Sequence, residues 1–215
     1  MSRSFDCADP EARVEGITAA AAAVAQGDLV VLPTDTVYGL GADAFSAEAV
    51  ARLLLAKGRG RDMPVPVLIG SVRTLDGIAA NIPDIARDLV AAFWPGPLTV
   101  ICHQQPTLMW DLGETRGTVA VRMPLHAVAL ELLRATGPLA VSSANLSGQD
   151  AATTAEEAED QLGDWVEVYL DGGPTSDSQP SSIIDVTSGR PRLLRVGAVS
   201  AEELRSVAAD LEVLG

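Results

Sequence analysis

The chain has 215 residues, a formal net charge of −14, 47% hydrophobic residues and only 4% aromatic ones. This is the composition of a globular protein rather than a disordered one, and the acidic balance argues against a broad nucleic-acid-binding face, although a local basic groove stays open. Cys7 and Cys102 are too few for a disulfide framework and favour a reducing, cytoplasmic setting, and no apolar run reaches the roughly 18–20 residues that a membrane span needs.

The first part of the chain predicts two helices around one buried strand. Apolar residues at helical spacing indicate a helix over 10–26 whose inward face carries Val14, Ile17, Ala21 and Val24. The continuous apolar run at 29–32 is typical of a buried strand, and the segment 33–43 is predicted to be a long loop. Ser46 is suited to cap a second helix that runs to about Ala56.

The rest of the chain predicts short strands that are only partly separated by helices. Strands are expected at 65–69, 98–102, 118–122, 138–142, 166–170, 183–186 and 192–196, and helices at 71–80, 83–93, 125–135, 154–162 and 200–212. Because several strands follow one another directly, we expect one domain built on a mixed sheet with helices packed on it. The Gly-, Ser- and Pro-rich segment 171–182 is predicted to be a flexible loop.

Common catalytic motifs are weak or missing. The segment GLGADA (39–44) matches a dinucleotide-binding pattern, but it does not sit in a tight strand-to-helix turn. The sequence has neither a Walker-type phosphate loop nor a G-x-S-x-G elbow. His103 and His126 are the only histidines, and their surroundings support neither a Ser–His–Asp site nor a metal site.

Three polar segments each have a structural and a functional interpretation. The loop PTDTVYGLG (33–41) is either an ordinary turn or a ligand loop whose glycines let backbone N–H groups approach. In KGR (57–59), the only lysine of the chain either complements a helix C-terminus or joins Arg59 in a phosphate clamp. The segment SSAN (142–145) offers hydroxyls and an amide to a turn or to a ligand.

Two arginines lie at or near the ends of otherwise apolar strands. Arg122 closes TVAVR, and Arg195 sits similarly near the end of RLLRV (192–196), so each guanidinium emerges near the end of a strand. Each one needs an anionic partner there. The sequence leaves open whether that partner is a protein carboxylate or a ligand.

Taken in order, these segments make the chain similar to the YrdC-like family, the threonylcarbamoyl-AMP synthases. The resemblance covers about residues 28–200, in the segments PTDTVYGLGADA (33–44), KGR (57–59), WPGPLT (94–99), TVAVRMPLH (118–126), SSANLSG (142–148), LDGG (170–173), SSIID (181–185) and LLRVGAVS (193–200). It implies a single α/β (α+β) domain over 1–215, with a core at about 10–200 and a twisted mixed sheet that encloses a positively lined cavity. It also implies the short form, without an additional C-terminal domain.

The resemblance implies a reaction in which L-threonine, bicarbonate (or CO2) and ATP give threonylcarbamoyl-AMP and pyrophosphate. This is the first step of the t6A37 modification of tRNA. Mg²⁺ would accompany ATP and be held mainly by its phosphates. Threonylcarbamoyl-transferase proteins would take the product, so that tRNA is involved only indirectly and no membrane is involved.

The family's functional residues fall on matching positions of this sequence. The resemblance implies catalytic roles for Lys57, Arg59, Ser143 and Asn145. It implies threonine contacts from Thr36, Arg122, Ser143 and Ser181, and ATP contacts from Lys57, Arg59, Thr118, Asn145, Thr153 and Arg195. The chain departs from many relatives at Gly60, where they have proline, and at Leu68, where they have histidine.

Two other functions stay open at the level of sequence. One is an RNA-binding or ribosome-associated module of the same fold, which the charge of −14 disfavours. The other is a carbamoyl-phosphate-dependent enzyme that makes a carbamoyl adenylate. Related domains of that kind lie in longer chains with zinc motifs, and this sequence has no such motif.

Overall fold

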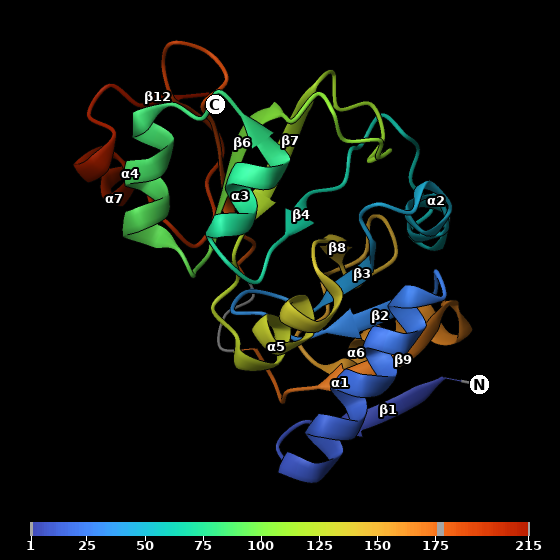
Figure 1. Ribbon diagram of the computed structural model, residues 1–215. Coiled ribbons are helices and arrows are strands. Elements are labelled where there is room, and N and C mark those ends of the chain that lie inside the picture. Colours follow the sequence, from blue (N-terminus) through green and yellow to red (C-terminus); the bar gives the residue numbers. More distant parts are fainter. Residues whose placement is uncertain (1, 176–178, 215) are drawn as a thin grey trace.

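One twisted mixed sheet organises the computed structural model, which describes residues 2–175 and 179–214 (Figure 1). Its strands are β1 (Arg3–Asp6), β2 (Leu29–Leu32), β3 (Gly39–Asp43), β4 (Val67–Leu68), β5 (Ala79–Ala80), β6 (Leu98–Gln104), β7 (Thr118–Arg122), β8 (Leu139–Ser143), β9 (Val166–Asp171), β10 (Ser182–Asp185), β11 (Arg192–Arg195) and β12 (Glu212–Val213). Within the described residues the order is β1-β9-β2-β3-β8-β4-β7-β6-β10-β11-β12, and β5 pairs with β6. Parallel pairs such as β2 with β9 occur beside antiparallel ones such as β2 with β3, so the predicted mixed sheet is confirmed.

The helices pack on this sheet as the sequence predicted, with shifted ends. They are α1 (Pro10–Ala25), α2 (Ala47–Ala56), α3 (Arg73–Ile78), α4 (Asp84–Phe93), α5 (Ala127–Thr136), α6 (Ala155–Leu162) and α7 (Ala201–Val207). Ser46 caps α2, as predicted, by accepting a hydrogen bond from the Ala49 amide. In Figure 1, α3 and α4 lie beside the half of the sheet that holds β6, whereas α1, α5 and α6 lie around β2 and β9. None of the helices in the described residues has the length and apolarity needed to cross a bilayer.

Strand β2 is covered by helices on both faces. Val30 and Leu32 pack in a cluster with α1 and α5, whereas Leu29 and Val31 pack in a second cluster with α2 and α6. Side chains alternate between the faces of a strand, so burial on both sides requires an unbroken apolar run. This accounts for the run at 29–32.

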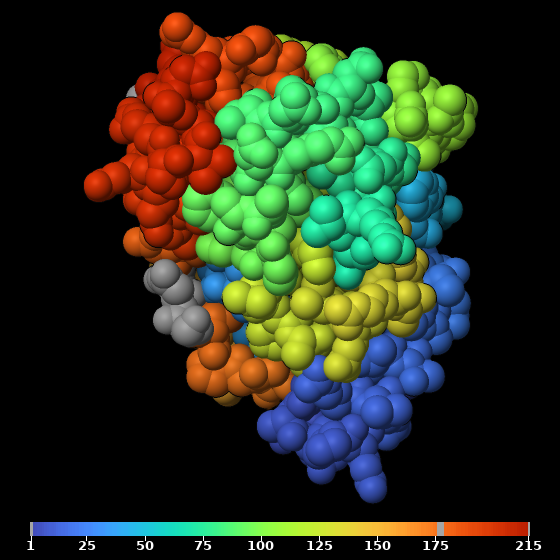
Figure 2. Space-filling model, turned by 60° about the vertical axis from the view of Figure 1, so that its left-hand side comes forward, coloured from blue at the N-terminus to red at the C-terminus, as the bar shows by residue number. Residues whose placement is uncertain are grey.

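The other half of the sheet is covered on one face only. Helices α4 and α7 share a cluster with Val100 of β6 and Ile184 of β10. The space-filling view shows the C-terminal segment against the region of α4 (Figure 2). Their strand neighbours Thr99, Ile101 and Ile183 point to the opposite face, which lines a cavity.

The predicted inward face of the first helix is confirmed in part. Val24 is buried, and Ile17 and Ala21 pack against the same core cluster. The prediction is wrong at Val14. Val14 is 69% exposed, whereas the buried positions of α1 are mainly small residues: Gly16, Ala19, Ala20, Ala23 and Val24. A Cβ atom on Gly16 would lie 2.8 Å from Cβ of Phe5, so the helix approaches β1 closely. The buried positions of α1 are those where its backbone comes close to neighbouring elements. They are not the positions with the largest apolar side chains.

The predicted loop over 33–43 is also wrong in its second part, because Gly39–Asp43 is strand β3. It pairs antiparallel with β2 on one side and with β8 on the other. Glycine weakens strand propensity, which hid this strand in the sequence. The structure explains the glycine, because a Cβ atom on Gly39 would lie 2.6 Å from Cγ1 of Val141.

We expect Gly39→Ala to lower the free energy of unfolding by about 1–3 kcal/mol, because the added methyl overpacks a buried contact. Gly77→Ala is the matched control, since a Cβ atom there meets nothing within 4 Å. In an exposed helical position this change should be neutral or stabilising by roughly 0.5–1 kcal/mol. Urea unfolding of both variants checks this, and equal stabilities would contradict the packing argument.

Several boundaries differ from the predicted ones. The last helix ends at Val207 instead of 212, and the chain then forms the edge strand β12 beside β11. The strand predicted at 65–69 is reduced to Val67–Leu68. Strands β1, β5 and β12 were not predicted, since they are short and lack an apolar alternation. The flexible loop predicted at 171–182 includes 176–178, which lie outside the described residues.

Candidate active site

A cavity of about 610 Å³ lies over the uncovered face of the sheet. Strands β6 and β7 form its floor, where Ile101 and Ala120 are register partners. Its polar lining comes from strand ends and from the loops that follow them: Thr34, Thr36, Arg59, Thr99, Arg122, Ser142, Ser143, Asn145, Gln149, Asp150, Ser181 and Arg195. Apolar walls from Leu68, Val141 and Ile183 complete it. The pocket therefore combines apolar walls with polar groups from several segments, as in many small-molecule sites.

Arg122 is held by three neighbours inside the protein. Its Nε atom donates to the Gly96 carbonyl (3.0 Å), Nη1 to Oγ1 of Thr36 (2.9 Å) and Nη2 to Oδ1 of Asp35 (2.7 Å). The side chains of Arg122 and Asp35 are only 7% and 12% exposed. The partner that the sequence left open is thus a protein carboxylate, although Arg122 still borders the cavity.

Arg195 has no carboxylate partner among the described residues. It donates through Nε and Nη2 to the carbonyl of Ser181 (2.9 and 2.7 Å) and through Nη2 to its Oγ atom (3.1 Å). Oγ of Ser181 also lies 2.8 Å from Oγ1 of Thr99. Burial and the nearby Arg122 lower the pKa of Arg195, so an anion between these two arginines would relieve their repulsion.

The turn at Gly58 separates the side chains of the K-x-R motif. The Gly58 amide donates to Leu55 and the Arg59 amide donates to Leu54, which is the Schellman closure of α2. Gly58 has φ +63°, a left-handed conformation that favours glycine. Beyond this reversal Lys57 and Arg59 reach different surroundings.

Arg59 lines the cavity and contacts only hydroxyl groups. Its Nη1 atom donates to Oγ of Ser142 (3.2 Å) and its Nε atom to Oγ of Ser147 (3.4 Å). No carboxylate pairs with it among the described ion pairs of residues 2–175 and 179–214. Its charge is therefore available to an anionic ligand.

Lys57 lies behind the cavity wall and is fully buried. Its ammonium donates to the carbonyls of Ser143 and Asn145 and to Oδ1 of Asn145 (2.7 Å). Burial, and secondarily Arg59, lower the pKa of Lys57 to about 7. Oγ of Ser143 lies 3.4 Å from Nζ as well, so four oxygens of one loop surround the ammonium.

Lys57 gives the free energy of unfolding a pH dependence of defined sign. Its pKa falls from the ordinary value of 10.5 to about 7 in the folded state. Between these values the unfolded chain keeps a proton that the folded chain has released, so stability rises with pH. We expect the urea midpoint of the wild type, relative to Lys57→Met, to rise between about pH 6.5 and pH 8.5. A difference that stays constant over this range would contradict the lowered pKa.

Tyr38 fixes the loop that follows β9. Its hydroxyl donates to the carbonyl of Gly173 (2.6 Å) and accepts from the amide of Gly172 (3.1 Å). Burial raises the pKa of Tyr38, so the phenol stays protonated. This loop closes on the PTDT segment, because a Cβ atom on Gly172 would lie 2.7 Å from Cγ of Pro33.

The structure brings most of the predicted site residues to this one cavity: Thr36, Arg59, Arg122, Ser143, Asn145, Ser181 and Arg195. Lys57 lies one layer behind the lining. Thr118 and Thr153 are not among the lining residues. Thr118 donates to the Thr115 carbonyl, and Thr153 donates to the carboxylate of Glu157. Thr99 was missed, although alternation along β6 places it on the same face as Ile101.

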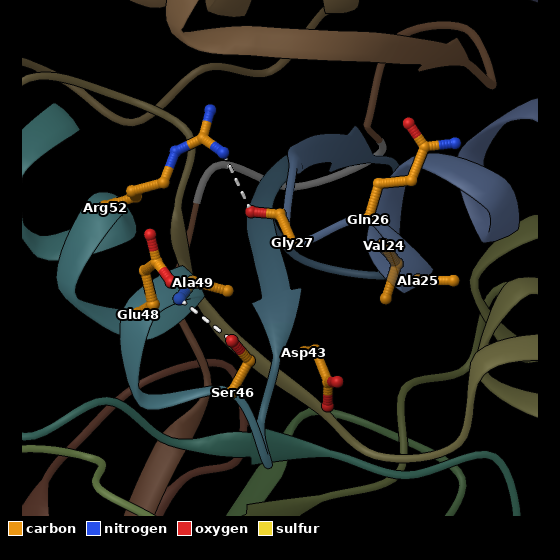
Figure 3. A pocket seen from close by; sticks show the side chains of 9 residues that line it. All are labelled: Val24, Ala25, Gln26, Gly27, Asp43, Ser46, Glu48, Ala49 and Arg52. Carbon is orange, nitrogen blue, oxygen red and sulfur yellow. Dashed lines mark hydrogen bonds between the residues drawn. The ribbon is translucent and has the colours of Figure 1, made fainter.

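A second, smaller cavity of about 220 Å³ lies between the end of α1 and the start of α2 (Figure 3). Arg52 reaches the carbonyl of Gly27 there (3.0 Å) and pairs with Asp28. Asp43 and Glu48 also line it. Arg52 is the one arginine among the described lining residues and it is paired with Asp28, so this part of the chain offers the smaller cavity no free positive charge.

The described residues contain no group of three or more His, Cys, Asp or Glu side chains placed to hold a metal ion. Asp150 is the one carboxylate among the lining residues of the larger cavity in this part of the chain. This side-chain set is unlike a cage for a divalent cation, which takes several carboxylates.

Comparisons with known proteins identify the family of this chain. Residues 22–197 match the family model Sua5_yciO_yrdC, described as "Telomere recombination". The chain is 58% identical over 207 residues to a putative threonylcarbamoyl-AMP synthase of Mycobacterium tuberculosis, covering 96% of this chain and 95% of that one. A structure titled as Pyrococcus abyssi Sua5 complexed with L-threonine superposes with a TM-score of 0.92 at 36% identity.

The match to the Pyrococcus structure covers all of this chain but only 62% of that protein. Escherichia coli YciO superposes with a TM-score of 0.83 at 26% identity, with 95% of this chain and 100% of that one covered. By family model, sequence identity and fold, the chain belongs to the Sua5/YciO/YrdC family.

Proposed function

We propose that this protein is an L-threonylcarbamoyladenylate synthase, which joins L-threonine, bicarbonate (or CO2) and ATP into threonylcarbamoyl-AMP and releases pyrophosphate. The proposal rests on one observation. Arg59 and Arg195 both line a cavity of about 610 Å³, and neither forms an ion pair with a carboxylate among the described residues. Such a cavity suits a substrate set with several separate anionic groups. The names and titles of the relatives point to the same substrates.

Electrostatics and positioning carry most of the proposed mechanism. The amine of threonine takes up CO2 as a carbamate, and a carbamate oxygen attacks the α-phosphorus of ATP while pyrophosphate leaves. Arg122 and Ser181 are suited to the threonine carboxylate, and Arg59 to the triphosphate. Holding three anions in contact requires donors that offset their repulsion. The carbamate oxygen thereby receives the adenylyl group of ATP, so the reaction is that of a nucleotidyltransferase, and no protein nucleophile is needed.

Ser143 and Asn145 lie between the two proposed subsites. Oγ of Ser143 donates to Oδ1 of Asn145 (2.6 Å), and Nδ2 of Asn145 donates to the carbonyls of Leu146 and Gln149. The side chains therefore fix one another before any ligand arrives. We assign to them the orientation of the carbamate and the α-phosphate.

ATP enters as its Mg²⁺ complex in this proposal. When bound to ATP, Mg²⁺ would supply positive charge beside the pyrophosphate leaving group. With Asp150 as the lone lining carboxylate in the described chain, the phosphates supply most of its ligands. Thr118 and Thr153 stay candidates for the nucleotide side only if ligand binding changes their bonds to Thr115 and Glu157.

The mixed anhydride that is formed needs an acceptor. We propose that threonylcarbamoyl-transferase proteins consume it in the t6A modification of tRNA, so that this chain meets tRNA only indirectly. The setting we propose is the cytoplasm, where the two buried free thiols, Cys7 and Cys102, are kept reduced.

Pyrophosphate release tests this proposal. We expect release with ATP, Mg²⁺ and bicarbonate only when L-threonine is present, and much less with serine or valine. Release that does not depend on threonine would overturn it. Release with carbamoyl phosphate in place of bicarbonate and threonine would instead favour the carbamoyl-phosphate-dependent alternative.

A further inference from the structure

The K-G-R motif holds one loop from two sides. Lys57 donates from the interior to Ser143 and Asn145, and Arg59 donates from the cavity side to Ser142 and Ser147. The loop 142–147 is therefore clamped between the two cations. The two residues of the motif differ in what they have left to offer a ligand.

The ammonium of Lys57 is fully used by the protein. The residue is 0% exposed, and its ammonium donates to the carbonyl and Oγ of Ser143 and to the carbonyl and Oδ1 of Asn145. Its own carbonyl accepts from the amide of Ser147 (3.1 Å). One residue thus binds the loop at both ends, through side chain and backbone.

The contacts of Lys57 are all neutral. No carboxylate faces the ammonium from the helix α2, from the loop 143–147 or from its own turn, and the charged group acting on it is Arg59. A buried cation without a counter-ion is costly, and such a group persists where its hydrogen bonds hold a needed geometry. The geometry here is that of Ser143 and Asn145.

We propose that Lys57 is a positioning residue, which sets Ser143 and Asn145 through its buried hydrogen bonds, while Arg59 of the same motif is the group that meets the anionic ligand. This inference rests on the proposed function for the identity of the ligand. The ordering of the loop by Lys57 does not depend on it. The lowered pKa of Lys57 agrees with a group that solvent and phosphate do not reach in the ligand-free protein.

The single lysine makes a direct test available in the wild-type protein. Protein labelled with ¹³C,¹⁵N-lysine gives one side-chain amine signal without an assignment problem. We expect this signal to keep its hydrogen-bonded shift when Mg²⁺ and AMP-PNP are added, with no ¹⁵N–³¹P coupling at Nζ. A measurable coupling between Nζ and a phosphate would overturn the positioning role.

A matched pair of variants separates the two cations. Lys57→Met should speed amide exchange in residues 143–149 of the ligand-free protein by about tenfold or more, because the loop loses its buried bonds, while exchange in β2 is unchanged. Arg59→Met removes only the longer bonds to the hydroxyls of Ser142 and Ser147 (3.2 and 3.4 Å), so it should speed this exchange much less than Lys57→Met does. Equal loop protection in Lys57→Met and the wild type would overturn the inference.

Steady-state kinetics distinguish a positioning role of Lys57 from a purely structural one. Lys57→Met should lower kcat and raise KM for both threonine and ATP, whereas Arg59→Met should raise KM for ATP with threonine KM unchanged. A Lys57→Met enzyme that is impaired only in KM for ATP would assign Lys57 to the phosphates instead. If the wild type releases no pyrophosphate, the proposed function fails, and the exchange and lysine spectra still decide the role of Lys57.

Discussion

Replacing Asp35 with alanine is expected to lower the free energy of unfolding by about 3–5 kcal/mol, because the guanidinium of Arg122 would stay buried without a counter-ion. Asp35 also accepts from the amide of Leu125 (2.8 Å), so the loop before α5 loses an anchor as well. Chemical denaturation measures the effect. We expect threonine affinity to fall with it, since Thr36 and Arg122 share this network.

Two further variants sharpen this test. Asp35→Asn keeps an acceptor at Oδ1 and should fall between wild type and Asp35→Ala. Asp76→Ala removes an exposed ion pair with Arg87 and should cost only about 0.2–1 kcal/mol. Equal losses in Asp35→Ala and Asp76→Ala would show that burial of the first pair does not matter.

Replacing Arg59 with methionine is expected to lower kcat/KM for ATP roughly 10- to 150-fold, which corresponds to about 1.5–3 kcal/mol for a hydrogen bond to a charged group. The expectation follows from a guanidinium that lines the cavity and bonds only to hydroxyls. Steady-state pyrophosphate release measures it.

The control for Arg59 lies two residues further along the chain. Arg61 pairs with Asp111 at the surface (2.7 Å) and is not among the lining residues of the cavity. Arg61→Met should therefore leave kcat/KM within about twofold, since exposed pairs contribute little. Similar losses in both variants would mean that overall charge, and not the position of Arg59, governs ATP binding.

The sequence was most informative where one local rule decided the outcome. The apolar run at 29–32 predicted a strand buried on both faces, and Ser46 predicted the start of α2. Prediction failed where neighbours distant in sequence decide. Gly39 reads as a loop residue until Val141 is packed against it, and Val14 reads as core until the close approach of Gly16 to Phe5 is known.

At the site, too, some features could be predicted from local sequence and others depend on residues distant in the chain. Strand-end arginines and the order of the motifs identified the residues that converge on the cavity. They gave no means of telling that Asp35 is the partner of Arg122, because the two residues are 87 positions apart. Nor did they show that the turn at Gly58 sends Lys57 behind the wall and Arg59 to the cavity. Such directions depend on the fold of the whole sheet.

The most direct test of the central claim is incorporation of ¹³C-bicarbonate into the product. Incubation of the purified protein with ATP, Mg²⁺, L-threonine and ¹³C-bicarbonate, followed by mass spectrometry, should yield threonylcarbamoyl-AMP that carries one ¹³C atom. Its formation should keep pace with pyrophosphate release and should fail in Arg59→Met at low ATP. Pyrophosphate release without a labelled adenylate, or an adenylate without the label, would contradict the proposed synthase activity.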